Sequence, residues 1–224
     1  MVATSGVVLA AGRGTRFGGE ESKVWAPLAG KPVLAHPLEA FARANAVDEI
    51  VVVVRPRDEA RAASVVRGLP LPTRVVPGGE RRLDSARAGV AAARGEVVLI
   101  HDGARPLASL DLIQRVLAAT LRHGAAVPVV PVADTVRYAR EGFLAETLDR
   151  AELVLIQTPQ GFRRELLVAG YAEADRRGLD LPDDAAAVLL LGRPVAAVPG
   201  DPKNLKVTRR EDLAVAERFL IPSS

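Results

Sequence analysis

A glycine-rich loop behind a short apolar run constrains most strongly what this chain can fold into. Residues 7–9 are Val-Val-Leu, which is typical of a buried strand in a parallel sheet, and four glycines follow between positions 12 and 19. Arg13, Arg16 and Lys23 lie among or just after these glycines. Glycines allow backbone N–H groups to turn toward an anion, and nearby cations neutralise its charge. The stretch therefore predicts a strand followed by a triphosphate-binding loop.

Two better-known glycine-rich motifs do not fit this loop. A dinucleotide-binding loop needs a third glycine three residues after the second, where this chain has Phe17. A Walker A loop ends in Gly-Lys-Ser or Gly-Lys-Thr, whereas Lys23 stands between Ser22 and Val24. From this stretch alone, an ordinary surface turn between a strand and a helix remains the alternative to a phosphate-binding loop.

Composition excludes several other classes of protein. The chain has no cysteine, which rules out disulfides, a thiol nucleophile and cysteine-based metal sites, and leads us to expect a reducing, cytoplasmic location. The net charge is only +3 and aromatic residues make up 4% of the chain, so we expect no nucleic-acid partner. Because no apolar run reaches the roughly 18 residues of a membrane span, we expect no membrane association either.

Strands and helices alternate through the first 130 residues. We expect strands at 50–54, 73–76, 97–100 and 125–130, and helices at 32–45, 58–67, about 85–94 and 111–122. This alternation predicts an α/β fold, a Rossmann-like, doubly wound and mostly parallel sheet. The polar stretches 10–23, 77–85 and 101–106 each follow a predicted strand. Since ligands bind beyond the carboxyl ends of such strands, the three stretches should converge on one site.

The alternation fails between residues 131 and 153. Two short strands, at 135–138 and 143–148, flank Arg140-Glu141-Gly142 and predict a β-hairpin. We expect an arm that reaches toward a second subunit, with an edge hairpin packed on its own domain as the alternative. The α/β pattern then resumes with strands at 153–157 and 195–198 and helices at 163–177, about 183–191 and 211–219. The chain is therefore predicted to form one domain, 1–224, with the arm as a subdomain.

Five motifs, in this order and spacing, give the chain a family resemblance. They are L-A-A-G-R-G-T-R-F-G (9–18) closing on Lys23, G-G-E-R-R-L-D-S (78–85), H-D-G-A-R-P (101–106), D-T-V-R (134–137) with L-D-R (148–150) and T-P-Q (158–160), and N-L-K-V-T-R-R-E-D-L (204–213). The first resembles the loop of nucleotidyltransferases that activate sugars and alcohols. Together they resemble the 2-C-methyl-D-erythritol 4-phosphate cytidylyltransferase family of the non-mevalonate isoprenoid pathway. The resemblance implies a nucleotide-diphospho-sugar transferase-like fold, and transfer of CMP from CTP to methylerythritol phosphate with Mg²⁺, in a homodimer joined by the arm.

The same resemblance implies a role for particular residues. The catalytic residues would be Arg16, Lys23 and Lys206; the CTP-binding residues Ala10, Ala11, Gly12, Gly14, Gly79, Glu80 and Ser85; and the acceptor-binding residues Asp102, Arg105, Thr135 and Arg150, the last two serving the neighbouring subunit's site. Magnesium would be held chiefly by phosphate oxygens, with Asp102 as a candidate protein ligand. A phosphate monoester is already a nucleophile at neutral pH, so no general base is required.

Three departures from the family pattern bear on the site. Ser22 stands where most members have proline, which predicts a looser loop, and Glu80 stands where aspartate is usual. Pro182 replaces the threonine of a T-D-E-A motif and cannot donate its hydroxyl hydrogen bond. A proline before Asp183 and Asp184 is also typical of a helix start, which we favour. The alternatives left open are a ribitol-5-phosphate cytidylyltransferase, another sugar-phosphate nucleotidyltransferase, or a CTP-binding scaffold without catalysis.

Overall fold

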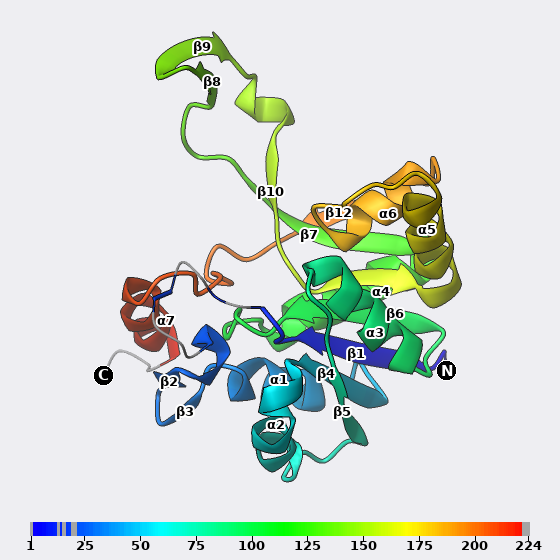
Figure 1. The fold of residues 1–224 in the computed structure, drawn as a ribbon. Helices are drawn as coiled ribbons and strands as arrows, with labels where there is room; N and C mark the ends of the chain where they lie inside the picture. Colours follow the sequence, from blue (N-terminus) through cyan, green and yellow to red (C-terminus); the bar gives the residue numbers. More distant parts are fainter. Residues whose placement is uncertain (1, 13, 15–16, 19–21, 221–224) are drawn as a thin grey trace.

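The computed structural model describes residues 2–12, 14, 17–18 and 22–220 of the chain. Within these residues, eight strands form one sheet in the order β10-β7-β11-β6-β1-β4-β5, with β12 paired to β7 (Figure 1). The strands are β1 (Thr4–Leu9), β4 (Glu49–Val54), β5 (Thr73–Pro77), β6 (Val97–Asp102), β7 (Ala125–Pro131), β10 (Val154–Ile156), β11 (Gln160–Arg163) and β12 (Ala196–Pro199). β1, β4, β5 and β6 run parallel to one another, whereas β10 and β11 are antiparallel to their neighbours.

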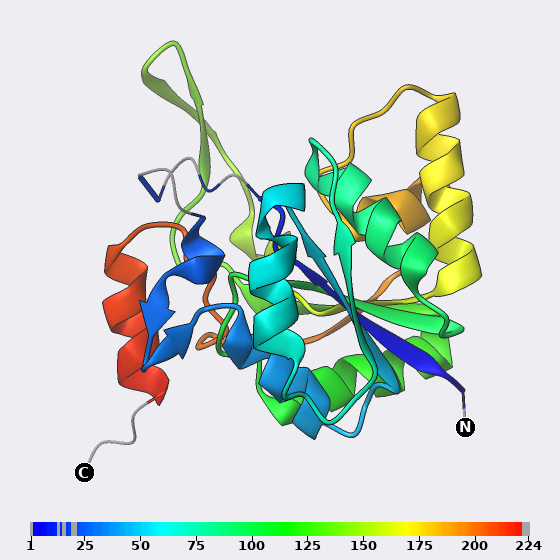
Figure 2. The same cartoon turned by 60° about the horizontal axis from the view of Figure 1, so that its bottom comes forward.

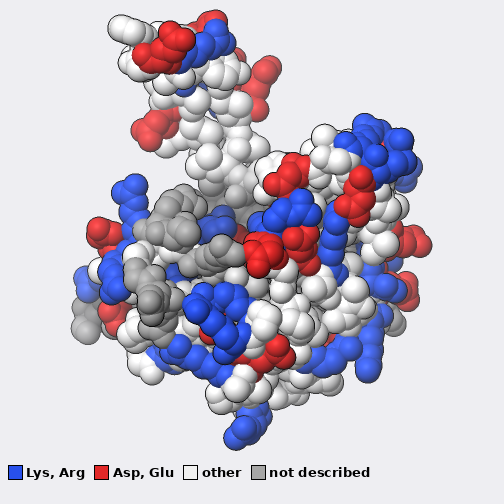
Figure 3. Space-filling view, in the orientation of Figure 1, with Lys and Arg blue, Asp and Glu red and all other residues white. Residues whose placement is uncertain are grey.

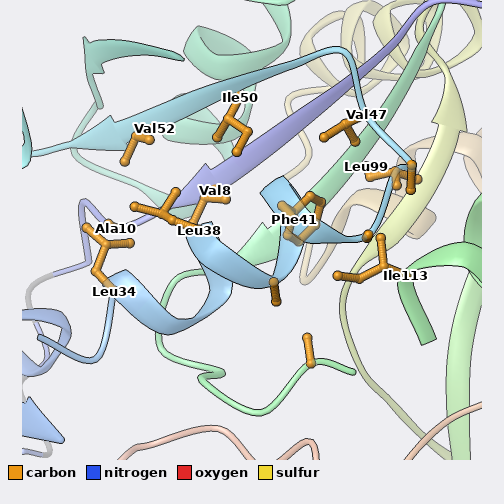
Figure 4. Packing of buried hydrophobic residues seen from close by; sticks show 14 of the residues in the cluster. Val8, Ala10, Leu34, Leu38, Phe41, Val47, Ile50, Val52, Leu99 and Ile113 are labelled. Carbon is orange, nitrogen blue, oxygen red and sulfur yellow. The ribbon is translucent and has the colours of Figure 1, made fainter. Parts of the chain in front are cut away.

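Helices cover both faces of this sheet. They are α1 (Ala35–Arg43), α2 (Glu59–Val66), α3 (Arg82–Ala92), α4 (Leu110–His123), α5 (Arg164–Arg176), α6 (Asp184–Leu190) and α7 (Glu211–Leu220). In β4, Val52 packs with α1, α2 and α4 in one apolar cluster, while Val51 packs with α3, α5 and α6 in another. Figure 4 shows the first cluster, with Leu38 of α1 beside Val8 and Phe41 farther along the same helix. Successive strand residues point to opposite faces, so burial on both sides requires uninterrupted apolar runs.

The predicted fold class is confirmed, but three strands are not indicated by the sequence pattern: the short pair β2 (Pro27–Leu28) and β3 (Lys31–Pro32), and β11 in the main sheet. β11 lies between β6 and β7, antiparallel to both, where the sequence predicts a site motif followed by a helix. Its four residues, of which Phe162 alone is strongly apolar, show no alternation that would predict a strand. The glycine in this strand, Gly161, reflects close packing against α4, because a Cβ there would lie 2.0 Å from Thr120 Oγ1.

The predicted hairpin is present, with its first strand beginning at Arg137 rather than at residue 135. β8 (Arg137–Arg140) pairs with β9 (Phe143–Thr147) through a turn in which Glu141 and Gly142 both have positive φ. The hairpin stands away from the main body (Figure 1). Phe143 and Leu144 are each 78% exposed. An arm that is apolar and exposed at once is typical of a surface that contacts another chain.

The last helix packs against the short two-stranded sheet formed by residues 27–32. A small apolar cluster joins Ala216 of α7 and Val207 to Leu28 of β2 (Pro27–Leu28), the strand that pairs with β3 (Lys31–Pro32). Figure 2 shows α7 against these two strands. The packing draws the segment 204–208 toward the carboxyl edge of the sheet. No helix among the described residues is long and apolar enough to span a membrane.

Candidate active site

One pocket opens at the carboxyl edge of the sheet, where the polar stretches meet. Its lining comes from the loop after β1, the 3₁₀ turn Lys23–Trp25, the start of α3, the end of β6 and the segment before α7. The lining residues are Leu9, Ala10, Ala11, Gly12, Gly14, Lys23, Val24, Gly79, Glu80, Arg81, Arg82, Ser85, Asp102, Ala104, Lys206 and Thr208. The predicted convergence of stretches distant in sequence is therefore confirmed.

Lys206 and Asp102 form an ion pair within this pocket. Asp102 is the last residue of β6, and its Oδ2 accepts a hydrogen bond from Lys206 Nζ at 2.7 Å across 104 residues of sequence. Val207 donates its N–H to the carbonyl oxygen of Ala104 at 2.8 Å, which ties the lysine segment to the turn after β6. The pairing places an ammonium group and a carboxylate side by side at the edge where ligands of such sheets bind.

Positive charge surrounds the Asp102 carboxylate. Burial alone would raise the pKa of Asp102, but Lys206 and Arg82, together with Arg105, hold that pKa well below its usual range. Arg105 Nε lies 3.7 Å from Oδ2, and Arg82 Nε lies 3.8 Å from Oδ1. Asp102 is therefore a stable carboxylate throughout the neutral range, able to accept hydrogen bonds from hydroxyl groups.

A buried histidine fixes the turn that carries these groups. The Nε2 atom of His101 lies 3.0 Å from the carbonyl oxygen of Arg105, which can only accept, so Nε2 bears the proton. His101 Nδ1 then accepts from the Thr158 hydroxyl at 3.0 Å, and Thr158 Oγ1 accepts the N–H of Asp102 at 3.0 Å. Burial lowers the pKa of His101 to about 4. The imidazole is thus neutral at physiological pH and positions the turn rather than donating protons.

Arg105 and Asn204 join this turn to the Lys206 segment. Arg105 Nη1 donates to the carbonyl oxygen of Asn204 at 2.8 Å, and the Asn204 amide donates to the carbonyl oxygen of Thr158 at 2.8 Å. The side chain of Arg105 is only 12% exposed, and burial lowers its pKa. Arg105 is thus held beside Asp102, within the wall of the pocket rather than on its surface.

The start of α3 forms the part of the pocket wall that packs against the loop after β1. Gly78 is required there, because a Cβ would lie 2.6 Å from Ala11 Cβ and 2.7 Å from Ser85 Oγ. Ser85 is buried, and the N–H of Arg81 donates to Asp84 Oδ2 at 3.1 Å, which caps the helix. The close packing brings backbone groups of the two segments together, an arrangement that can read the edge of a flat base.

Of the predicted catalytic cations, Lys23 and Lys206 line the same pocket. Arg16 lies outside the described residues, so its role stays a prediction. Gly14 has φ of +64°, which favours glycine. The Ser22 hydroxyl donates to the carbonyl oxygen of Gly12 at 3.1 Å. This bond joins Ser22 to Gly12, but residues 13, 15–16 and 19–21 lie outside the described residues, so the looser loop stays a prediction.

The predicted acceptor residues divide between two places. Asp102 lines the main pocket and Arg105 lies beside it, whereas Thr135 and Arg150 line a separate hollow on the arm with Thr147, Leu148 and Asp149. Arg150 Nη1 donates to the carbonyl oxygen of Ala133 at 2.6 Å. Within one chain these two groups of residues face different spaces, so their proposed cooperation requires the arm of a second subunit.

The sequence analysis places both Asp183 and Asp184 at a helix start, but their carboxylates have different partners in the structure. Asp183 Oδ1 accepts the N–H of Ala186 at 2.9 Å and caps α6, as expected. Asp184 is fully buried and accepts from Arg82 Nη2 at 2.7 Å. Arg82, Thr158 and Asn204 also belong to the site, although the sequence analysis assigns them no role. Each lies in one of the five motifs, and this membership is the signal that could have identified them.

Comparisons with known proteins agree with this geometry. The doubly wound sheet and the cation-lined pocket at its carboxyl edge define the class, an α/β nucleotidyltransferase. More narrowly, a family model described as IspD, 2-C-methyl-D-erythritol 4-phosphate cytidylyltransferase, matches residues 4–221, and the chain belongs to this family.

Relatives and solved structures match the chain over nearly its whole length. A 2-C-methyl-D-erythritol 4-phosphate cytidylyltransferase from Pelotomaculum thermopropionicum is 44% identical over 220 residues, 96% of this chain and 92% of that protein. A bifunctional enzyme IspD/IspF from Anaeromyxobacter dehalogenans is 45% identical over 96% of this chain, which spans 56% of that longer protein. The crystal structure of the cytidylyltransferase from Thermus thermophilus is 35% identical, with a TM-score of 0.82 and coverage of 98% of this chain and 99% of that one.

Proposed function

We propose that this protein transfers CMP from CTP to 2-C-methyl-D-erythritol 4-phosphate, releasing pyrophosphate and forming 4-diphosphocytidyl-2-C-methyl-D-erythritol. The observation that carries the proposal is the Lys206–Asp102 pair, which lines the same pocket as Lys23, a pocket built from four of the five motifs. A phosphate-binding cation and a hydroxyl-binding carboxylate side by side suit an acceptor that has both kinds of group.

The reaction is a direct displacement at the α-phosphorus of CTP. An oxygen of the acceptor phosphate forms a bond to that phosphorus, and the bond to the bridging oxygen of the β-phosphate breaks as pyrophosphate leaves. The acceptor is a dianion for much of its time near neutral pH, because its second pKa is about 6, so it needs no general base. Catalysis then consists of positioning and of neutralising charge on the α-phosphate and pyrophosphate, which we assign to Lys23, Lys206 and Arg16.

Two sides of the pocket bind the two substrates in this proposal. The nucleotide lies along the loop after β1 and the start of α3, where cytosine meets the backbone and side-chain groups of Ala10, Ala11, Gly12, Gly14, Gly79, Glu80 and Ser85. The acceptor hydroxyl groups lie against Asp102, with Arg105 holding that carboxylate in place.

Magnesium fits this pocket through the substrate. Among the described residues, no group of three or more histidine or acidic side chains could form a metal site. Asp102 is already bound to Lys206, so the donor set suits an ion held by triphosphate oxygens with at most one carboxylate from the protein. When bound, the ion neutralises triphosphate charge, and the chain's own lysines position the phosphates.

A second subunit would complete the acceptor site. Thr135 and Arg150 lie on the arm, and Arg suits phosphate because its planar fork binds two oxygens at once. The exposed Phe143 and Leu144 would be covered by a homodimer formed through the arm. A cytoplasmic location stays a prediction that rests on the absence of cysteine.

Pyrophosphate release with defined substrate pairs tests the proposed reaction. Purified protein with Mg²⁺ should release pyrophosphate from CTP when methylerythritol phosphate is present, and much less when UTP or GTP replaces CTP. Ribitol 5-phosphate as the acceptor is the matched control. Higher turnover with ribitol phosphate would reassign the acceptor, and CTP binding without turnover on any acceptor would leave a binding scaffold.

A further inference from the structure

A buried charge network lies behind the acceptor side of the pocket. Asp184, at the start of α6, accepts from the hydroxyl of Tyr171 on α5 at 2.7 Å and from Arg82 Nη2 on α3 at 2.7 Å. Asp184 is fully buried and Tyr171 is 5% exposed, whereas the side chain of Arg82 is 31% exposed and lines the pocket. Neither Asp184 nor Tyr171 reaches the pocket surface, so either acts on a substrate only through Arg82.

Arg82 is shared unequally between two carboxylates. Its Nη2 is 2.7 Å from Asp184 Oδ2, while its Nε is 3.8 Å from Asp102 Oδ1. Burial alone would lower the pKa of Arg82, but the charges of Asp184 and Asp102 raise it, so the guanidinium is permanently charged. The distances show that Asp184 anchors Arg82, and that Asp102 feels its charge without forming a close hydrogen bond to it.

Among the described residues, this unequal sharing leaves Asp102 Oδ1 without a close hydrogen bond. Lys206 occupies Oδ2 at 2.7 Å, and Oδ1 faces Arg82 at a distance longer than a hydrogen bond. A guanidinium released from Asp184 would be drawn to Oδ1, because an unanchored cation next to a partly buried carboxylate closes to contact. It would then occupy the position at which an acceptor hydroxyl could donate.

We propose that Asp184 and Tyr171 are positioning residues that hold Arg82 away from Asp102, so that Asp102 Oδ1 stays free to bind a hydroxyl group of the acceptor. The inference rests on the proposed function, in which Asp102 binds the polyol part of a phosphorylated alcohol. It also gives the α6 start a role in this chain that does not need the threonine replaced by Pro182. The start of α6 thus influences acceptor binding indirectly, through Arg82.

A double-mutant cycle in steady-state kinetics tests the proposal. Asp184→Asn should raise the KM for methylerythritol phosphate by about tenfold and leave the KM for CTP within about twofold, since the change lies on the acceptor side. In the Arg82→Gln background the same Asp184 substitution should have almost no further effect, because the guanidinium through which it acts is gone. If Asp184→Asn raised the acceptor KM by the same factor in the wild-type and Arg82→Gln backgrounds, the proposal would be overturned and Asp184 would be a purely structural residue.

Two further variants keep the test decisive. Tyr171→Phe removes one hydroxyl from the network and should raise the acceptor KM about threefold, in the same direction as Asp184→Asn, even if that variant fails to fold. Asp58→Asn is the matched control: Asp58 is a buried carboxylate that pairs with Arg55 at 2.7 Å, neither residue lines the pocket, and both KM values should stay unchanged. An unchanged acceptor KM in Tyr171→Phe, or a change in Asp58→Asn equal to that of the network variants, would refute the positioning role. An inactive wild-type protein would instead refute the proposed function.

Discussion

The pocket and the arm of this molecule are built in opposite ways. In the pocket, charged groups are held by partners far away in sequence: Lys206 pairs with Asp102 over 104 residues, and Arg82 pairs with Asp184 over 102. On the arm, Arg150 contacts Ala133, 17 residues away, and β8 pairs with the adjacent β9. The pocket is therefore assembled by the folding of the body, whereas the arm carries a local hairpin whose apolar side chains stay exposed.

The surface of the molecule shows the same difference. Acidic and basic side chains are interspersed over the body, whereas the stalk below the charged tip of the arm is mostly neither (Figure 3). Val154, Leu155 and Ile156 of β10, where the arm returns to the sheet, are all exposed apolar residues. The difference supports the proposal that a second chain covers the arm.

The largest expected effect comes from removing the long-range cation of the pocket. Lys206→Ala should lower turnover on the order of 10²–10³-fold, because a cation that neutralises growing charge in the transition state is lost. Pyrophosphate release at saturating substrates measures the loss. Lys203→Ala is the matched control, since Lys203 lies three residues away and contacts the ring of Phe219 rather than the pocket. Equal losses in both variants would contradict a specific role for Lys206.

The next prediction concerns the stability of the body in acid. The folded protein holds His101 neutral down to about pH 4, whereas the unfolded chain takes up a proton near pH 6.5, so acid favours unfolding. The free energy of unfolding should fall as the pH drops from 6.5 to 4, with at most about 3 kcal/mol of the fall due to His101. Chemical denaturation at stepped pH measures it.

The control for this prediction is the variant His101→Gln. Burial also lowers the pKa of His36, but that contribution is present in both proteins and cancels in the difference between their curves. The curve of the variant should be flatter than that of the wild type between pH 6.5 and 4. Parallel curves would show that His101 titrates normally in the folded protein.

In the body, the sequence predicts the elements that a local pattern determines and misses those that depend on long-range contacts. The run 50–54 predicts its strand because apolar residues in succession suit burial on both faces, and β4 is found there. β11 could not be predicted, since its place between β6 and β7 depends on contacts with both rather than on its own pattern.

The site likewise has a part that the sequence predicts and a part that it does not. Lys206 and Asp102 can be recognised because each lies in a motif and the alternation of strands and helices brings the strand ends together. The pairing of Arg82 with Asp184 cannot be recognised from the sequence, because an acidic residue buried by tertiary packing has the same local pattern as an exposed one at a helix start. The local pattern at Asp183 and Asp184 indicated the helix correctly and gave no sign that one of the two carboxylates is fully buried.

The arm allows a sharper test, because its residues should act in a neighbouring chain. Arg150→Ala should lower turnover by about 10- to 100-fold if it binds the acceptor phosphate of the partner site. Mixing this variant with Lys206→Ala and allowing subunits to exchange should restore activity, to about a quarter of the wild-type value for random pairing, since one site of each mixed dimer is intact. No recovery in a mixture shown to exchange subunits would place both residues in the same chain's site.

The smallest effect on a single chain is expected at the exposed end of the arm. Phe143→Ser removes a side chain that is 78% exposed, so the free energy of unfolding of a lone chain should change by less than about 0.5 kcal/mol. If the arm joins a dimer, however, the wild-type melting temperature should rise with protein concentration, and this dependence should weaken in the variant. Phe162→Ala, at a fully buried position of β11, should cost about 3–5 kcal/mol at any concentration. A wild-type melting temperature independent of concentration, with a monomer in sedimentation analysis, would show that the arm is covered by something other than a second copy of this chain.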